Sequence, residues 1–333
     1  MMRAAWARIR ILVGVGILVV LLWRLGSDAF VDGLRRIDAA ALLAALALGV
    51  ITTVFSAWRW CLVARGLGLR LPLGQAVADY YRSLFLNAAL PGGILGDVHR
   101  AVRHGQDAGD VGRGVRAVVL ERTAGQVVLI GVGVAVLFAS PSPALHDVRS
   151  LVAPGAVLAF AVAAAIVVAA AVGLRLAPGA SRVRRAVGSA LVESREGLFG
   201  RESLPGVAVS SAAVLAGHLA TFLLAARVAG SAAPAVELLP LMVLALLAMA
   251  LPLNVGGWGP REGVTAWAFG AAGLGATQGL TVAVVYGVLT FVASLPGAGV
   301  LAGRWLAGLR PQRPEFEFEE RVLAESGAAH RGA

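Results

Sequence analysis

The sequence predicts an all-α integral membrane protein, a polytopic helical bundle of about eight membrane elements. Of its 333 residues, 58% are hydrophobic and only 14% are charged, whereas a soluble domain carries about 25% charged residues. Several apolar segments reach the roughly 20 residues that a helix needs to cross the hydrocarbon layer. Two further apolar stretches are interrupted by glycine and proline, which predicts two re-entrant, broken hairpins related as an inverted repeat.

The charge pattern predicts the location of the protein. The net charge is +10, and the chain has arginine but no lysine. These arginines cluster at segment ends, as the positive-inside rule describes, so we expect the cytoplasmic (inner) membrane with both termini in the cytoplasm and no nucleic-acid partner. Cys61 is the single cysteine, which excludes an internal disulfide and a cysteine metal cluster. We expect no metal and no cofactor.

The first part of the chain predicts two spans and then a hairpin. Residues 7–25 resemble a signal peptide, but we expect a retained first helix, because no clear small-x-small cleavage site follows it. Residues 26–38 form an outer loop, and residues 39–64 form the second helix. This helix carries Arg59 between two tryptophans, which is typical of an arginine that snorkels to the headgroup level. Residues 75–103 are expected to enter from the cytoplasm and return there.

The middle of the chain predicts three more spans, at residues 115–139, 151–174 and 204–228. Residues 186–199, in the long basic loop between the last two, have an amphipathic pattern that suits the membrane interface. The last span contains His218, expected to be a hydrogen-bonded interior histidine, and Arg227, expected to snorkel to the headgroup level.

The final part repeats the pattern of the first hairpin. Residues 236–251 are expected to enter from the outer face and to break at residues 254–259, and Pro260 opens a short helix that ends near residue 273. A last span follows at residues 277–295. Residues 1–310 then form one transmembrane domain, and the polar residues 311–333 form a disordered cytoplasmic tail.

The two breaks, at residues 86–103 and 251–263, are the strongest functional signal. They read LPGGILGDVHR and LNVGGWGPREG, each with a Gly-Gly pair, another glycine and then charges. Each break starts a helix, with Asp97 as a plausible N-cap and Pro260 at the first helical position. Helix N-termini bind phosphate, and arginine adds a bidentate partner. Glycine pairs also serve close helix packing, but two breaks with matching charges favour function.

The candidate site therefore gathers both breaks. Asp97 and Glu262 could balance the arginines when the site is empty, or carry a proton during transport. Glu121 and Arg122 either form a buried ion pair or face the same cavity, where they could take part in coupling. The candidate headgroup- and phosphate-binding residues are Asn87, Gly92, Gly93, Gly96, Asp97, Arg100, Asn254, Gly256, Gly257, Gly259, Arg261 and Glu262.

These motifs resemble a known family. The pattern N-x-x-L-P-G-G-x-x-G-D-x-x-R at residues 87–100, E-R at 121–122 and N-x-G-G-x-G-x-R-E at 254–262 are similar to the transmembrane region of lysylphosphatidylglycerol synthases, a flippase-like superfamily. The resemblance covers about residues 10–310 and implies lipid translocation between leaflets. Full-length synthases add a soluble aminoacyl-transferase domain, which this chain lacks after its membrane part. We expect a stand-alone member that does not aminoacylate lipid, so its cargo is open.

Three functions are consistent with this sequence. The first is a translocase, a flippase or scramblase, that moves an anionic phosphate-bearing lipid. ATP-driven transport by this chain alone is not expected, because it has no lysine and no phosphate-binding loop. The second is a membrane-embedded transferase using a polyprenyl-phosphate donor, with Asp97, Glu121 or Glu262 as general base. The third is a non-transporting partner of a glycosyltransferase or lipid-modifying enzyme, bound through the basic loop 175–201 or the tail.

Overall fold

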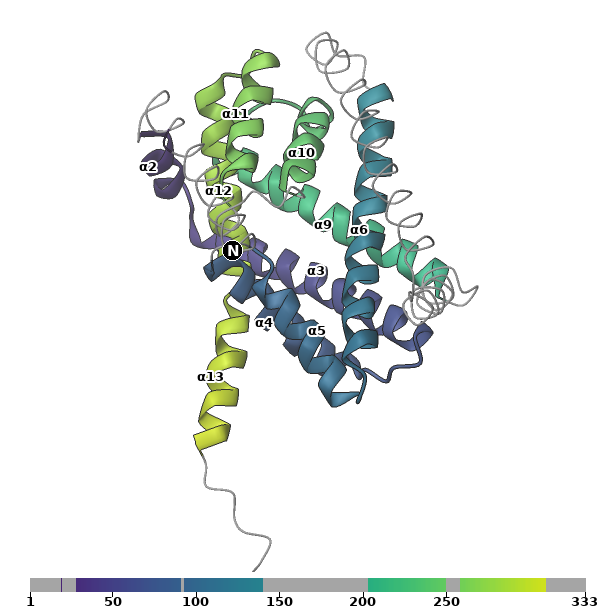
Figure 1. Ribbon diagram of the computed structural model, residues 1–333. Coiled ribbons are helices and arrows are strands. Elements are labelled where there is room, and N and C mark those ends of the chain that lie inside the picture. Colours follow the sequence, from purple (N-terminus) through teal and green to yellow (C-terminus); the bar gives the residue numbers. More distant parts are fainter. Residues whose placement is uncertain (1–18, 20–27, 91–92, 140–202, 250–257, 310–333) are drawn as a thin grey trace, which may run out of the picture. The chain divides into compact units, whose positions relative to one another are not determined.

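The computed structural model describes residue 19 and residues 28–90, 93–139, 203–249 and 258–309. All the elements in these residues are helices (Figure 1). Among the described residues, four stretches are long and apolar enough to cross a membrane: Ala39–Gly66, Val111–Val136, Leu204–Val228 and Ala276–Leu306. The predicted all-α membrane fold is confirmed. The predicted segments at residues 7–25, 151–174, 186–199 and 311–333 lie outside the described residues.

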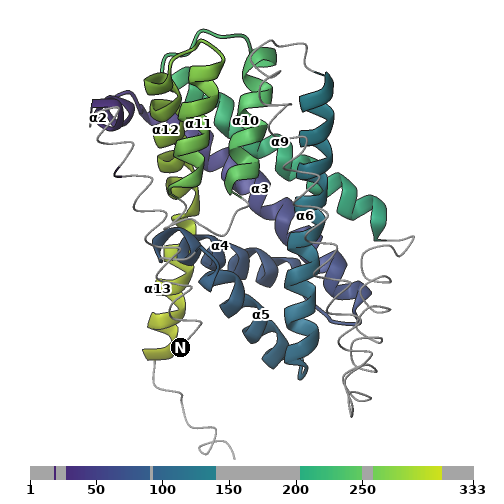
Figure 2. The ribbon, with the colours of Figure 1, turned by 45° about the horizontal axis from the view of Figure 1, so that its top comes forward.

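Three long helices form one packed group. Helix α3 (Ala39–Gly66) begins where Asp38 accepts a hydrogen bond from the Ala41 N–H at 2.8 Å, which satisfies a free donor of its first turn. It packs along α9 (Leu204–Val228) and against α12 (Ala276–Ser294), as both views show (Figures 1 and 2). Small residues allow the close approach, since a methyl group at Gly49 would lie 2.6 Å from the Ala293 Cβ.

The expected loop at residues 26–38 contains a short helix. Helix α2 (Asp28–Arg35) packs against α12, and Gly33 lies at that contact. The polar residues in this segment led us to expect a loop, but the segment forms a helix and one face of it packs.

The first broken hairpin consists of α4 (Leu73–Ala89) and α5 (Leu95–Asp107). The chain turns between them at a glycine, Gly93, whose φ of 62° lies in the left-handed region that glycine adopts readily. The two helices pack together, and α6 (Val111–Ala139) then packs on α5 and α3. The predicted break at this place is confirmed. Its re-entry from the cytoplasmic face stays a prediction.

The second broken hairpin consists of α10 (Ala235–Met249) and α11 (Pro260–Ala271). Pro260 occupies the first helical position, as predicted, and Gly259 precedes it with a φ of 119°. Helices α9 to α12 enclose an apolar core around Phe222, Phe269 and Tyr286. A second compact unit begins at Gly299 and contains most of α13 (Pro296–Leu309).

Candidate functional site

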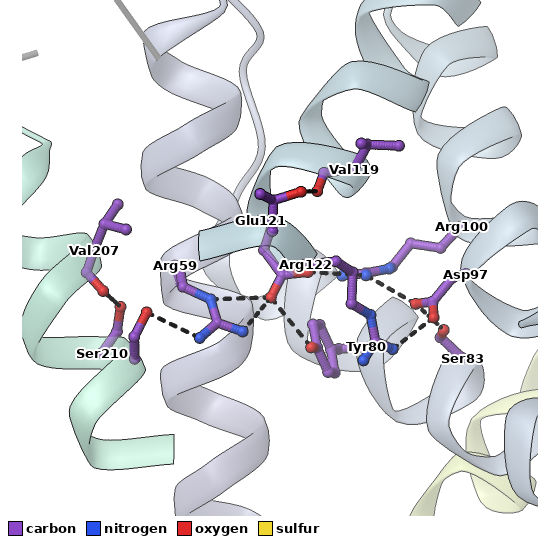
Figure 3. A network of polar contacts seen from close by, with 12 residues as sticks. Arg59, Tyr80, Ser83, Asp97, Arg100, Val119, Glu121, Arg122, Val207 and Ser210 are labelled. Carbon is purple, nitrogen blue, oxygen red and sulfur yellow. Dashed lines mark hydrogen bonds and ion pairs between the residues drawn. The ribbon is translucent and has the colours of Figure 1, made fainter. Parts of the chain in front are cut away.

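A buried carboxylate, Glu121 on α6, joins helices that are distant in sequence. Its Oε1 accepts hydrogen bonds from Arg59 Nε at 3.1 Å and Nη2 at 2.6 Å, and from the Tyr80 hydroxyl at 3.3 Å. Its Oε2 accepts from Arg100 Nη2 at 3.2 Å (Figure 3). Glu121 is fully buried. One carboxylate thus connects α3, α4, α5 and α6.

The carboxylate of Asp97 joins the first hairpin to α6. It accepts from Ser83 and Asn87 on α4, both at 3.0 Å, from Arg100 at 2.9 Å and from Arg122 at 2.6 Å. The expected N-cap role of Asp97 is wrong, because α5 already begins at Leu95 and Asp97 lies within its first turn. Burial alone would raise the pKa of Asp97, but Arg122 and Arg100 more than offset that effect and hold this pKa below its ordinary value.

The Arg100 guanidinium is enclosed between two aromatic rings. Its Cζ lies 4.5 Å from the centre of the Trp60 ring and 4.3 Å from that of Tyr80. The side chain is fully buried, and Arg100 does not line the cavity described below. Arg100 therefore holds the two carboxylates of this cluster, Asp97 and Glu121, in place.

A second ion pair lies at the start of α11. Glu262 accepts from the Gly259 N–H at 2.7 Å and from Arg261 Nε at 2.9 Å. The first bond satisfies a free donor of the helix N-terminus. Arg261 in turn lies between the rings of Trp258 and Tyr286, with its Cζ 5.3 Å and 5.2 Å from their centres. The two breaks therefore share one arrangement: an arginine lies between two aromatic rings and forms an ion pair with a carboxylate.

The first ion-pair group consists of Arg59, Asp97, Arg100, Glu121 and Arg122, and the second of Arg261 and Glu262. A cavity of about 380 Å³ lies between these two ion-pair groups. The first hairpin contributes Asn87 and Gly93 to its wall, and the second contributes Arg261 and Trp258 beside it. Arg59 and Arg122 also line it, together with hydroxyl and apolar side chains from α3, α6, α9, α10 and α12. The cavity thus combines three guanidinium groups with a largely apolar wall.

Only some of the predicted site residues lie at the cavity. Asn87, Gly93, Arg122 and Arg261 line the cavity, whereas Arg100 and the acids Asp97, Glu121 and Glu262 do not. Gly96 lies against the backbone of Ser83 and serves the packing of α5 on α4. Gly92, Asn254, Gly256 and Gly257 lie outside the described residues.

The Glu121–Arg122 pair shows how adjacent residues separate on a helix. The two side chains point to different partners, since Glu121 pairs with Arg59 and Arg100, and Arg122 pairs with Asp97. Both side chains are therefore in ion pairs, each with residues other than its neighbour. The alternative in which they face the cavity holds for Arg122 alone.

Sequence reasoning missed the role of Arg59. The expectation that it snorkels to the headgroup level is wrong, because its side chain is only 5% exposed and it is bonded to Glu121 and, at 3.1 Å, to Ser211. The flanking tryptophans favoured the snorkelling interpretation. The signal for a buried role was the charge itself, because it lies inside a predicted span. His218 was predicted correctly, since its Nδ1 lies 3.2 Å from the Tyr286 hydroxyl at the cavity wall. Arg227 is bonded to the Ser231 and Ala233 carbonyls, and its snorkelling stays a prediction.

One of three comparisons with known proteins found a match. No curated protein and no solved structure matches the chain. A family model described as the lysylphosphatidylglycerol synthase TM region matches residues 8–297, which include both hairpins and all the residues of the two ion-pair groups. The chain therefore belongs to the family of the lysylphosphatidylglycerol synthase transmembrane region, whose name ties it to lipid handling at a membrane.

Proposed function

We propose that the protein is a lipid translocase, a flippase or scramblase, that moves an anionic phosphate-bearing lipid across the cytoplasmic membrane. The observation that carries this proposal is the cavity between the two broken hairpins, with Arg59, Arg122 and Arg261 in its wall. A phosphate headgroup would pass through the cavity while the acyl chains stay in the bilayer. Both termini would lie in the cytoplasm, as the arginine distribution predicts.

The energetics of buried charge support this proposal. A guanidinium inside a membrane bundle is expensive, and such residues face interior cavities and mark substrate pathways. Arginine also binds two phosphate oxygens at once, and a cavity that held only water would not need such a group. Apolar side chains of the same wall, such as Leu129, Leu246 and Phe291, suit the part of a lipid that adjoins its headgroup.

The positions of the acids favour a translocase over a transferase. A general base must come within hydrogen-bond distance of the proton that it removes. Asp97, Glu121 and Glu262, the candidate bases, are held in ion pairs behind the wall and do not line the cavity. This arrangement supports binding and passage of a headgroup.

The test is lipid exchange in proteoliposomes. Phosphatidylglycerol labelled on an acyl chain keeps its natural headgroup, and a membrane-impermeant reductant reports which label has reached the outer leaflet. Wild-type protein should accelerate exchange well above that of protein-free vesicles. The variant Arg122→Ala/Arg261→Ala should slow it, because it removes two cationic groups from the cavity wall.

The matched control is Arg65→Ala, which removes an exposed arginine of α3 that does not line this cavity. It should exchange lipid at the wild-type rate. Exchange that the double variant leaves unchanged would remove the cavity from the lipid path. Exchange no faster than in empty vesicles would contradict the translocase, and transfer from a polyprenyl-phosphate donor would then be the activity to measure.

A further inference from the structure

We propose that the cavity accepts lipid headgroups that carry one uncompensated negative charge, a phosphodiester, and rejects headgroups that carry an ammonium group. This inference rests on the proposed function and names the substrate class of the same site. It excludes zwitterionic phospholipids. It also excludes the aminoacylated phospholipid after which the family is named.

The first step is the charge of the cavity wall. Three guanidinium groups line the cavity, those of Arg59, Arg122 and Arg261, and no carboxylate from the described part of the chain does so. The charged side chains that an ammonium group would meet in this cavity are therefore all cationic. Specificity of this kind comes from repulsion of the wrong ligand as much as from attraction of the right one.

The second step is that the nearby acids are already occupied: Asp97 and Glu121 have about four positions filled, and Glu262 has three filled and is fully buried. An ionised carboxylate offers about four acceptor positions. Asp97 already accepts from Ser83, Asn87, Arg100 and Arg122. Glu121 likewise accepts two bonds from Arg59 and one each from Tyr80 and Arg100. Glu262, fully buried, accepts from Gly259 and twice from Arg261.

The third step is the balance of charge in the two groups. At the second hairpin, Arg261 and Glu262 form a neutral pair. In the first group, three guanidiniums share two carboxylates, which leaves one positive charge. A monoanionic phosphodiester neutralises this excess, whereas a phosphodiester that carries its own ammonium does not. The asymmetry also places the headgroup nearer to the first hairpin.

The fourth step identifies Arg122 as the contact. Its side chain is 40% exposed, against 5% for Arg59 and 3% for Arg261. It also lines the cavity. Arg122 is therefore the guanidinium with the most exposed surface to offer to a phosphate.

The experiment compares three lipids with natural headgroups and the same acyl-chain label: phosphatidylglycerol, phosphatidylethanolamine and lysylphosphatidylglycerol. Each is exchanged as a trace component of phosphatidylcholine proteoliposomes. Wild-type protein should move phosphatidylglycerol at least about tenfold faster than the other two, which corresponds to about 1.4 kcal/mol of discrimination. Arg122→Gln should lower the phosphatidylglycerol rate and reduce this ratio, Arg122→Lys should keep part of it, and Arg65→Gln should keep all of it.

A binding measurement separates the two proposals. Native mass spectrometry of the purified protein, with the same lipids and with a polyprenyl-phosphate sugar, reports selectivity without transport. The polyprenyl lipid is also a phosphodiester monoanion, and its preference over phosphatidylglycerol would identify the source of the headgroup. Selective binding of a monoanionic lipid without exchange would support the substrate class and overturn the translocase.

Equal exchange of all three phospholipids would overturn the selectivity and leave the translocase standing. Preferred binding of lysylphosphatidylglycerol or phosphatidylethanolamine would also overturn it. Absence of both exchange and binding would overturn both proposals. The decisive comparison uses wild-type protein only, so it stands even if an Arg122 variant does not fold.

Discussion

Arg59 Nη2 lies 2.6 Å from Glu121 Oε1, although the two residues stand 62 positions apart. Arg59 belongs to α3 and Glu121 to α6. Because Glu121 also binds Arg100 of α5 and Tyr80 of α4, a single carboxylate connects four helices. Because this ion-pair group is buried, a substitution that breaks one of its pairs should lower the stability of the protein.

The change Glu121→Gln should destabilise the protein strongly. It leaves the guanidiniums of Arg59 and Arg100 buried with one fewer carboxylate, and breaking a buried pair from one side costs about 3 kcal/mol or more. Thermal unfolding of the detergent-purified protein measures the effect. Asp107→Asn is the control, because Asp107 forms an exposed pair with Arg103 at 3.9 Å, and such pairs contribute less than about 1 kcal/mol. Equal melting temperatures for the two variants would contradict the role of Glu121.

The change Gly96→Ala should prevent α5 from packing on α4. A methyl group built at Gly96 would lie 2.7 Å from the Ser83 Cα and closer still to the Ser83 carbonyl oxygen. Backbone atoms cannot yield as a flexible side chain does, so we expect a loss of about 3 kcal/mol. Gly74→Ala is the matched control, since Gly74 is the second residue of α4 as Gly96 is of α5 and a methyl there meets nothing within 4 Å. Size-exclusion profiles and melting temperatures should separate the two variants.

The change Asn87→Asp should destabilise the first hairpin while preserving the shape of the side chain. Asn87 accepts from the Gly96 N–H at 2.8 Å and donates to Asp97 at 3.0 Å. An aspartate would keep the acceptor but place a second carboxylate against Asp97, at a cost of about 1–3 kcal/mol. Gln106→Glu adds the same charge at an exposed position of α5 and should change the melting temperature little. A similar shift in both variants would mean that added charge alone is responsible.

Asp97 should remain ionised throughout the neutral pH range. Its pKa in the folded protein is lower than its unfolded value, because Arg122 and Arg100 outweigh the effect of burial. The resulting stabilisation is complete above the unfolded pKa of about 3.9 and is lost as the pH falls toward the folded pKa. The difference in melting temperature between wild type and Asp97→Asn should therefore be constant from about pH 5 to 8 and shrink below about pH 4. A difference that varies near neutrality would instead favour Asp97 as a proton carrier.

The sequence by itself determined the class of the protein and the places where its helices break. Apolar length identified the spans at α3, α6, α9 and α12, and glycine with proline located both hairpins. These features depend on local composition, which acts within one or two turns of a helix. The family motifs also drew attention to Asp97, Arg122, Arg261 and Glu262 before any contact was known.

Only the tertiary structure decided which charges pair and which face the cavity. Successive residues of an α-helix point about 100° apart, with 3.6 residues per turn, so Glu121 and Arg122 turn to different neighbours. Arg100 matched the motif yet became enclosed by Trp60 and Tyr80, and Arg59 matched no motif yet became part of the wall. Which charges pair depends on the distances between helices that are far apart in the chain. Local sequence patterns do not determine those distances.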